Sequence, residues 1–327
     1  MRIAVTGARG LVGGFVVDHF HRRGDAVRAL TRSAAPAGSG ARTGASAGAG
    51  AGAWAGAKAA SAPASEHVQW IHGALPDADA VAALLDGADA VVHCAFDHVP
   101  GRYRGGEGDD PQGFIERNLA ATRALLDGAA RYGVARVVLL SSRAVFGAEP
   151  RAAPIDDDAG ATPDTTYGHL KHAEERLAAA LADPERAPLA CVLRATGIFG
   201  VVEPIERSKW FDLAVAVRDG APPPAPRRGT EVHGDDVADA IARLIHAPAL
   251  AVAGRAINCS DLEVDQRVLV AGLAARLAVP ARLPDAGPPV VNAMRCAGLR
   301  ELGWRPGGQG RLDATLDRLA AAVSPGV

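Results

Sequence analysis

The sequence predicts an α/β protein with a doubly wound parallel sheet, and two observations lead to this fold class. Short apolar runs alternate with longer segments of helical periodicity from the N-terminus up to residue 193. Glycines at positions 7, 10 and 13 follow the first apolar run and lead directly into the first helical segment. Strand–helix alternation is typical of parallel sheets covered by helices, whose ligands bind where the strands end.

Each strand is predicted from a short run of Val, Ile, Leu and Ala. Runs of this kind are expected where a strand is buried on both faces. The predicted strands span residues 3–5, 27–30, 68–71, 90–93, 137–140 and 189–193. The helices predicted between them span residues 11–23, 78–85, 114–132 and 167–181.

One connection departs from this alternation. Residues 34–65 consist almost entirely of Ala, Gly, Ser and Pro, where a helix would normally join the second and third strands. Because so little apolar surface cannot offset the entropy cost of ordering the chain, the sequence predicts a flexible low-complexity insertion. A functional lid that carries Trp54 onto a bound cofactor is the alternative.

Composition excludes several classes of partner. A net charge of −2, with no concentrated basic stripe, argues against nucleic acid or an anionic membrane. No apolar run approaches the roughly 20 residues of a membrane span, and polar residues break the N-terminal run. The four scattered cysteines predict reduced thiols and a cytoplasmic location. The ten histidines show no metal-ligand spacing, so no metal is predicted.

The glycine turn predicts a site for a pyrophosphate. Backbone N–H groups at the start of a helix, together with the helix dipole, favour an anion there. The expected contacts come from Thr6, Gly7, Arg9, Gly10, Leu11, Val12 and Gly13. Glycines that only allow close packing of helix and strand are the alternative.

A second motif carries acid–base chemistry. Tyr167 and Lys171 are four residues apart and therefore share one face of the predicted helix, and Ser142 ends an earlier strand. An ammonium beside a phenol favours the phenolate, so the tyrosine can exchange a proton with a substrate oxygen that the serine holds. The spacing alone also occurs by chance on solvated helices.

Taken together, these motifs resemble the extended short-chain dehydrogenase/reductase family, which includes nucleotide-sugar epimerases. Further segments match the family in order. They are Asn118 with Thr122, residues 141–147, Leu193 with Arg194, His233 with Asp236, and residues 302–306 around Trp304. The resemblance implies an NAD(P)-binding Rossmann domain of residues 1–198 plus 232–259. It also implies a smaller C-terminal substrate lobe of residues 199–231 plus 260–327.

The resemblance also implies roles for single residues. Tyr167 is the proton donor or acceptor at the reacting oxygen, and Lys171 assists it and binds the nicotinamide ribose. Ser142 orients the substrate carbonyl or hydroxyl, and Asn118 steadies the active-site helix. Ala95, at the end of the fourth strand, is expected to contact the cofactor.

The end of the second strand bears on the choice of cofactor. An acidic residue there binds the adenosine ribose, whereas an arginine accepts a 2′-phosphate. Thr31 stands at this position and Arg32 follows it, with Arg9 expected at the same corner. Two guanidinium groups without a competing carboxylate favour NADP(H). NAD(H) stays an alternative, because both arginines could be solvated.

Departures from the family pattern bear on the reaction. Arg143 and Ala144 stand where sugar dehydratases have an acid pair, so dehydration is disfavoured. Gly229 stands where epimerases carry a diphosphate-binding arginine, although Arg227 and Arg228 are adjacent. The sequence therefore favours an NADPH-dependent carbonyl reductase or alcohol dehydrogenase. A nucleotide-sugar epimerase with bound NAD is the alternative.

A non-catalytic Rossmann redox sensor is an alternative of another class, and the serine, tyrosine and lysine set argues against it. The expected partner is a small-molecule carbonyl or alcohol whose identity the sequence does not specify. By analogy with the family, helices 114–132 and 167–181 could form a homodimer interface.

Overall fold

The computed structural model describes residues 1–32, 68–99, 106–151, 153–183, 185–290 and 292–324. The predicted insertion at 34–65, with Trp54, lies outside the described residues.

The main sheet confirms the predicted doubly wound α/β fold. Seven parallel strands lie in the order β3-β2-β1-β4-β5-β6-β9. The order reverses between β1 and β4, and a ligand of such a sheet binds at the carboxyl ends of the strands at that point. The strands are β1 Arg2–Thr6, β2 Ala26–Thr31, β3 Val68–His72, β4 Ala90–His93, β5 Arg136–Ser142, β6 Leu189–Ala195 and β9 Ala256–Cys259.

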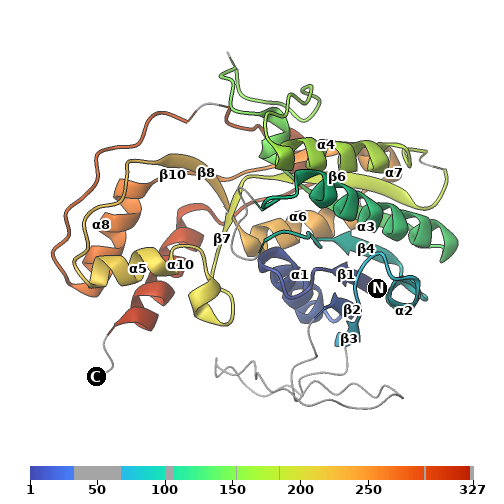
Figure 1. Cartoon of the computed structure of the whole chain (residues 1–327), viewed down its shortest axis with the longest axis horizontal. Coiled ribbons are helices and arrows are strands. Elements are labelled where there is room, and N and C mark those ends of the chain that lie inside the picture. The colour runs from blue at the N-terminus through green and yellow to red at the C-terminus, as the bar shows by residue number, and fades with distance from the viewer. Residues whose placement is uncertain (33–67, 100–105, 152, 184, 291, 325–327) are drawn as a thin grey trace.

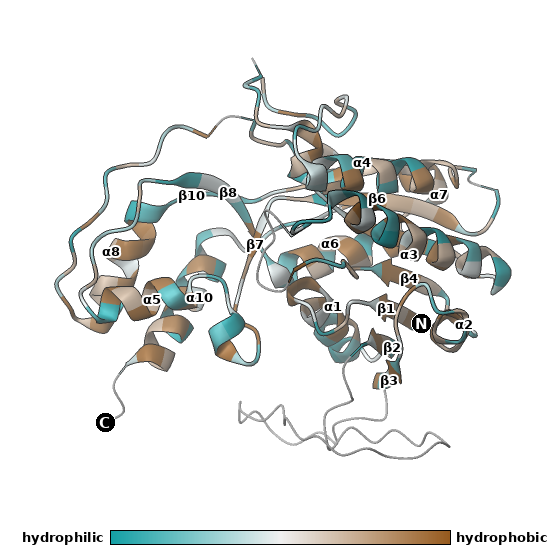
Figure 2. Ribbon diagram, in the orientation of Figure 1, coloured by the Kyte–Doolittle hydropathy of each residue, from teal (hydrophilic) through white to brown (hydrophobic). Residues whose placement is uncertain are grey.

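Helices cover both faces of this sheet (Figure 1). Helices α1 and α6 pack against each other on one face, and α2, α3 and α4 form a layer on the other. Strands β1 and β4 are mostly apolar, whereas α3 and α4 alternate between hydrophobic and hydrophilic residues (Figure 2). The bounds are α1 Leu11–Arg22, α2 Ala78–Leu85, α3 Pro111–Arg131, α4 Thr166–Ala179, α6 Gly234–His246 and α7 Ala249–Val252.

A smaller lobe is built on a second sheet of three strands in the order β10-β8-β7. Strand β8 pairs antiparallel with β10 and parallel with β7. A separate apolar core joins this lobe's helices α5, α8 and α10. The bounds are β7 Gly197–Phe199, α5 Phe211–Arg218, β8 Arg228–His233, β10 Leu262–Asp265, α8 Gln266–Leu277 and α10 Gly308–Val323.

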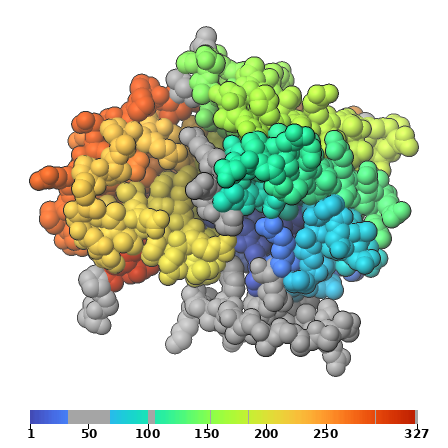
Figure 3. Space-filling view, in the orientation of Figure 1, coloured from blue at the N-terminus to red at the C-terminus, as the bar shows by residue number. Residues whose placement is uncertain are grey.

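On the face shown in Figure 3, the lobe's residues in yellow to red lie beside the blue-to-green residues of the main-sheet part. Near the C-terminus the chain returns to the main sheet, where α9 (Ala297–Glu301) packs against β9. Trp304 is fully buried there, and its ring N–H donates to the Asp236 carbonyl at 2.9 Å. The predicted domain boundaries stay predictions, and the segment around α9 packs outside the expected lobe.

Within the described ranges, no helix is both long and apolar enough to cross a membrane.

Candidate active site

The turn between β1 and α1 lies close to the backbone at the end of β4 and to the first turn of α1. Gly7 has a φ of +64°, and a Cβ added to it would lie 2.6 Å from the Ala95 nitrogen. A Cβ on Gly13 would overlap the Gly7 carbonyl oxygen. Only glycine fits at both positions, so β1, β4 and α1 converge at this turn as the motif predicts.

The start of α1 leaves backbone donors for an anion. Gly10 is the N-cap and has no side chain to satisfy the first N–H groups of the helix, and its own N–H donates to the Gly7 carbonyl at 2.8 Å. A small cavity adjoins the turn, lined by Ala8, Arg9, Gly10, Leu11, Gly14, Val202, Glu203 and Arg207. Exposed N–H groups beside a backbone cradle suit the pyrophosphate of a dinucleotide.

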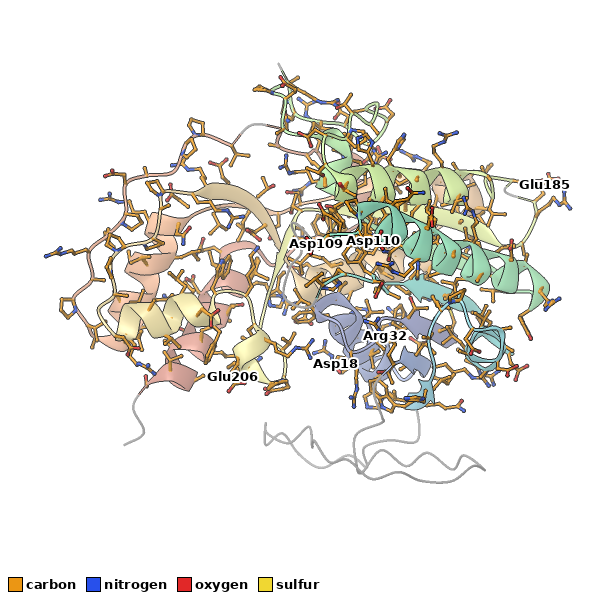
Figure 4. All side chains as sticks on the ribbon, viewed as in Figure 1. Asp18, Arg32, Asp109, Asp110, Glu185 and Glu206 are labelled. Carbon is orange, nitrogen blue, oxygen red and sulfur yellow. The ribbon has the colours of Figure 1, made fainter. Side chains whose placement is uncertain are left out.

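The corner predicted to bind the adenosine ribose contains a carboxylate. Arg32 lies at the end of β2, and Asp110 at the start of α3 (Figure 4). The Arg32 guanidinium contacts an Asp97 carboxylate oxygen at 2.9 Å, and Arg117 contacts the other oxygen at 3.1 Å. Arg9 instead lies over the Trp70 ring, 5.6 Å from its centroid. The absence of a competing carboxylate, on which the NADP(H) preference depended, therefore does not hold.

Ser142, Tyr167 and Lys171 come together at the carboxyl edge of the sheet. The short helix η1 (Arg143–Phe146) directly follows Ser142, and a Cβ on Gly168 would lie 2.5 Å from the Ala144 carbonyl oxygen. The Lys171 ammonium donates to the Leu140 carbonyl of β5 at 3.2 Å. Helix α4 therefore packs its first turns against the end of β5, where Ser142 stands.

The Ser142 hydroxyl is oriented by its own chain. Its oxygen accepts a hydrogen bond from the Ala144 N–H at 3.2 Å, which caps η1. Its proton is not engaged by any described residue, so the hydroxyl can donate to a substrate oxygen.

The segment after β4 closes over the tyrosine and the lysine. The Phe96 ring meets the Tyr167 ring edge to face at 5.2 Å, and the Lys171 ammonium lies 5.0 Å from the Phe96 centroid. Asn118 fixes this segment because its amide accepts from the Asp97 N–H at 2.8 Å and donates to the Asp97 carbonyl at 3.0 Å. In the structure Asn118 thus contacts the segment after β4, and its proposed effect on α4 stays a prediction.

Two neighbouring glutamates on α4 are buried, and sequence reasoning missed both. Glu174 accepts from Lys171 at 2.8 Å, and Glu175 makes a two-point contact with Arg194 at 2.9 and 2.8 Å. Burial pulls the pKa of Lys171 down, but the Glu174 carboxylate and Tyr167 outweigh that effect and raise it. Helical spacing of three and four residues from Lys171 is the signal that could have found them.

The lobe contributes charged groups at the boundary with the sheet. Arg207 donates to the Arg9 carbonyl at 3.2 Å and so contacts the glycine turn. Lys209 forms an ion pair with Glu231, and Glu231 occupies the space where a side chain on Gly197 would stand. Among the residues that the structure describes, no group of His, Cys, Asp or Glu could hold a metal ion.

A glycine turn at the switch point of a Rossmann sheet, beside a serine, tyrosine and lysine, defines an enzyme of the short-chain dehydrogenase/reductase class. The chain belongs to the NAD dependent epimerase/dehydratase family, whose model matches residues 3–260.

Curated relatives match part of the chain. A dTDP-glucose 4,6-dehydratase of Streptomyces niveus is 29% identical over 180 residues, which cover 55% of this chain and 49% of the relative. A 3 beta-hydroxysteroid dehydrogenase/Delta 5-->4-isomerase of Mycobacterium tuberculosis is 28% identical over 208 residues, covering 61% of this chain and 47% of the relative. The chain therefore aligns with about half the length of these relatives.

Solved structures match over nearly the whole chain. The dTDP-glucose 4,6-dehydratase of Streptomyces venezuelae, with NAD and TYD bound, is 25% identical with a TM-score of 0.72, covering 98% of this chain and 97% of that one. The UDP-glucose 4-epimerase of Thermotoga maritima, with UDP-glucose, has the same TM-score at 18% identity and covers 98% of both chains. The second likeness shows the fold alone.

Proposed function

We propose that this protein is an NAD(H)-dependent enzyme that oxidises and re-reduces a secondary hydroxyl of a nucleotide sugar, with epimerisation as the result. The observation that carries the proposal is the packing of α4, which bears Tyr167 and Lys171, against the end of β5, where Ser142 stands. The printed activities of the relatives supply the substrate class.

The chain's own groups handle the proton. The Ser142 oxygen accepts from the Ala144 N–H, and its hydroxyl proton donates to the reacting oxygen. The Tyr167 oxygen takes the proton from a substrate hydroxyl during oxidation and returns it during reduction. Lys171 supplies a positive charge beside the tyrosine throughout, 5.9 Å from its ring centroid. A bound nicotinamide ring supplies the site that accepts and returns hydride.

The lobe offers a cation for a diphosphate near the expected position. Gly229 lacks the expected arginine, and Arg228 is paired with Asp265 at 2.9 Å and with Glu263 at 3.2 Å. The Arg227 guanidinium, however, lies 3.7 Å from the place of a Cβ on Gly229. Arg227 thus extends over the position where the family's arginine begins, which favours a nucleotide-sugar substrate.

The cofactor we propose is NAD(H), in place of the NADP(H) that the sequence favoured. The carboxylate of Asp97 lies at the adenosine corner and already engages Arg32 and Arg117. A 2′-phosphate brings more negative charge to this carboxylate, whereas ribose hydroxyls do not. The solved dehydratase with bound NAD supports the same choice.

A one-way reductase or dehydrogenase is the second candidate, because one curated relative is a 3 beta-hydroxysteroid dehydrogenase/Delta 5-->4-isomerase. Dehydration is not proposed, because Arg143 and Ala144 supply no carboxyl group.

A direct test incubates the purified protein with UDP- and dTDP-sugars and follows the sugar epimers by NMR, while absorbance reports net cofactor reduction. We expect epimer exchange without net cofactor change. Tyr167→Phe should lower the rate by at least about 100-fold, as loss of a general acid–base group does. Tyr132→Phe, at the far end of α3, is the control and should not change it. Stoichiometric cofactor oxidation by ketones, without epimer exchange, would instead establish the reductase.

A further inference from the structure

A continuous chain of buried polar groups connects the glycine turn with Lys171. Thr6 and Thr122 are fully buried, and His93, Glu174 and Lys171 are at most 6% exposed. The Thr6 hydroxyl lies 2.7 Å from His93 Nδ1, and His93 Nε2 lies 3.1 Å from the Thr122 hydroxyl. The Thr122 hydroxyl donates to Glu174 Oε1 at 3.0 Å, and Lys171 donates to Glu174 Oε2 at 2.8 Å.

The direction of donation along this chain follows from its two ends. The Thr122 proton is given to Glu174, so Thr122 must accept from a proton on His93 Nε2. Burial lowers the pKa of His93 to about 3, so the ring is neutral and its Nδ1 accepts from the Thr6 hydroxyl. Thr6 in turn accepts from the Ala95 N–H at 3.1 Å. Every donor therefore points toward the Glu174 carboxylate.

The ammonium of Lys171 keeps one donor for a ligand. An ammonium has three N–H donors. One is used by Glu174 at 2.8 Å and one by the Leu140 carbonyl at 3.2 Å. The geometry therefore fixes the head group of Lys171 in the interior and leaves a single N–H for a hydroxyl of cofactor or substrate.

Glu174 also provides the negative charge that a buried ammonium needs. The titratable groups that face Lys171 are Glu174 and Tyr167 on α4, and His93 and Cys94 at the end of β4. His93 is neutral, and burial raises the pKa of the Cys94 thiol to about 12, so it is neutral too. Among these described groups, Glu174 is the one that forms an ion pair with the ammonium, at 2.8 Å.

We propose that Glu174 is a positioning residue of the active site. Its carboxylate holds the Lys171 ammonium charged and in place, and through Thr122 and His93 it links that ammonium to the turn that receives the cofactor. The inference deepens the proposed function, since it rests on the catalytic part given there to Lys171. Glu175, the next residue on α4, is equally buried but pairs with Arg194 and Ser141, so it is a matched control.

The lysine content of the chain allows a direct measurement. Only three lysines occur, at positions 58, 171 and 209, so 13C labelling at lysine Cε gives three signals that lysine-to-arginine variants assign. In the full-length protein we expect Glu174→Gln to lower the pKa of Lys171 by at least about 2 units, since buried lysines without a counter-charge fall by up to 3–5 units. Glu175→Gln should leave it near the wild-type value. An unchanged Lys171 pKa in Glu174→Gln, or an equal fall in both variants, would overturn the proposal.

A second measurement needs no change at Glu174 and so remains decisive if that variant does not fold. 15N NMR of histidine-labelled wild-type protein should show that His93 is neutral at pH 7 with its proton on Nε2. The His93 signal is identified as the one that disappears in the His93→Gln variant. A proton on Nδ1, or a charged ring, contradicts the direction of the chain. Neither measurement involves turnover, so a negative result here is distinct from failure of the proposed epimerase activity.

Discussion

Two adjacent glycines at the start of α1 have opposite surroundings, and they provide a test of the cofactor turn. A Cβ on Gly13 would overlap the Gly7 carbonyl, whereas a Cβ on Gly14 would meet nothing within 4 Å. Gly13→Ala should displace the turn, abolish measurable cofactor binding and destabilise the fold by about 1–3 kcal/mol, as overpacking does.

Gly14→Ala is the matched control for this prediction. It should leave binding intact and stabilise the protein by up to about 1 kcal/mol through helix propensity. Isothermal titration with cofactor and denaturant unfolding measure both effects. Equal cofactor affinity in the two variants would show that the turn does not approach the pyrophosphate.

Asp97 is the residue that should set the preference between the two cofactors. Its carboxylate pairs with Arg32 at 2.9 Å, and the Arg32 side chain is 69% exposed. Asp97→Asn frees Arg32 for a 2′-phosphate, so the ratio of the NADP to the NAD dissociation constant should fall. An exposed pair contributes about 0.2–1 kcal/mol, so the expected change is about 1.4- to fivefold. The ratio is obtained by titrating each cofactor into wild type and variant, and an unchanged ratio contradicts this role.

At the scale of elements, α6 begins at a histidine that must stay neutral. His233 accepts from the Asp235 N–H at 3.1 Å, and its ring packs against Phe15 and Phe199. Burial, with Arg311 and Arg318 nearby, lowers the pKa of His233 to about 4 despite the opposing effect of Asp235. Protonation of this ring therefore opposes the cap of α6.

The sign of the pH effect follows from comparing the folded and unfolded chains. A histidine in the unfolded chain has a pKa of about 6.5, so its contribution to stability is complete above that pH. As the pH falls from 6.5 towards 4, the unfolded chain takes up the proton first and stability is lost. Melting temperatures should fall more steeply over this interval in wild type than in His233→Asn, which keeps a capping side chain without a titrating one. Parallel curves would contradict the prediction.

The first six strands of the main sheet were predictable because their signals are local, whereas β9 was not among the predicted strands. Apolar runs such as 137–140 become strands, and the glycines of the first turn mark the switch point. The strands of the lobe were not predicted, because β8 and β10 are short and polar and owe their form to pairing with each other.

The active site shows the same division between local and long-range information. The four-residue spacing of Tyr167 and Lys171 placed both on α4. The contact of Arg32 with Asp97 joins residues 65 positions apart, and the chain from Thr6 through His93 to Thr122 joins three elements. No local sequence pattern reveals contacts of that kind. The predicted preference for NADP(H) therefore did not take into account Asp97, whose carboxylate pairs with Arg32.

At the scale of the whole molecule, the main-sheet part carries the proposed acid–base groups, and the lobe carries the cations proposed to bind the substrate. If Arg227 holds a diphosphate, Arg227→Ala should raise the KM for a nucleotide sugar about tenfold or more with little change in kcat, since a charge-assisted hydrogen bond contributes about 1.5–3 kcal/mol. Arg282→Ala removes another exposed arginine of the lobe and serves as the control. Steady-state kinetics of both variants test this role. The same KM in Arg227→Ala as in Arg282→Ala would exclude Arg227 from the substrate site.

The homodimer expected from the family stays a prediction. The large apolar side chains that are exposed in the described residues are Met1, Val99, Leu250, Val268 and Leu283, and none of these lies on α3 or α4. Light scattering at several concentrations would measure the assembly state directly.

Lys171 and Lys209 differ in their access to solvent, because the Lys171 side chain is 7% exposed and the Lys209 side chain is 24% exposed. Lys171 belongs to the main-sheet part and Lys209 to the lobe, and each is held by a glutamate. Reagents that acylate amines attack only a neutral, accessible amine, so Lys171 should react only when the main-sheet part opens locally, whereas Lys209 should react without such opening. Mass spectrometry of acetylated peptides over time would therefore report how often the main-sheet part opens around Lys171, with acetylation of Lys209 as the internal reference.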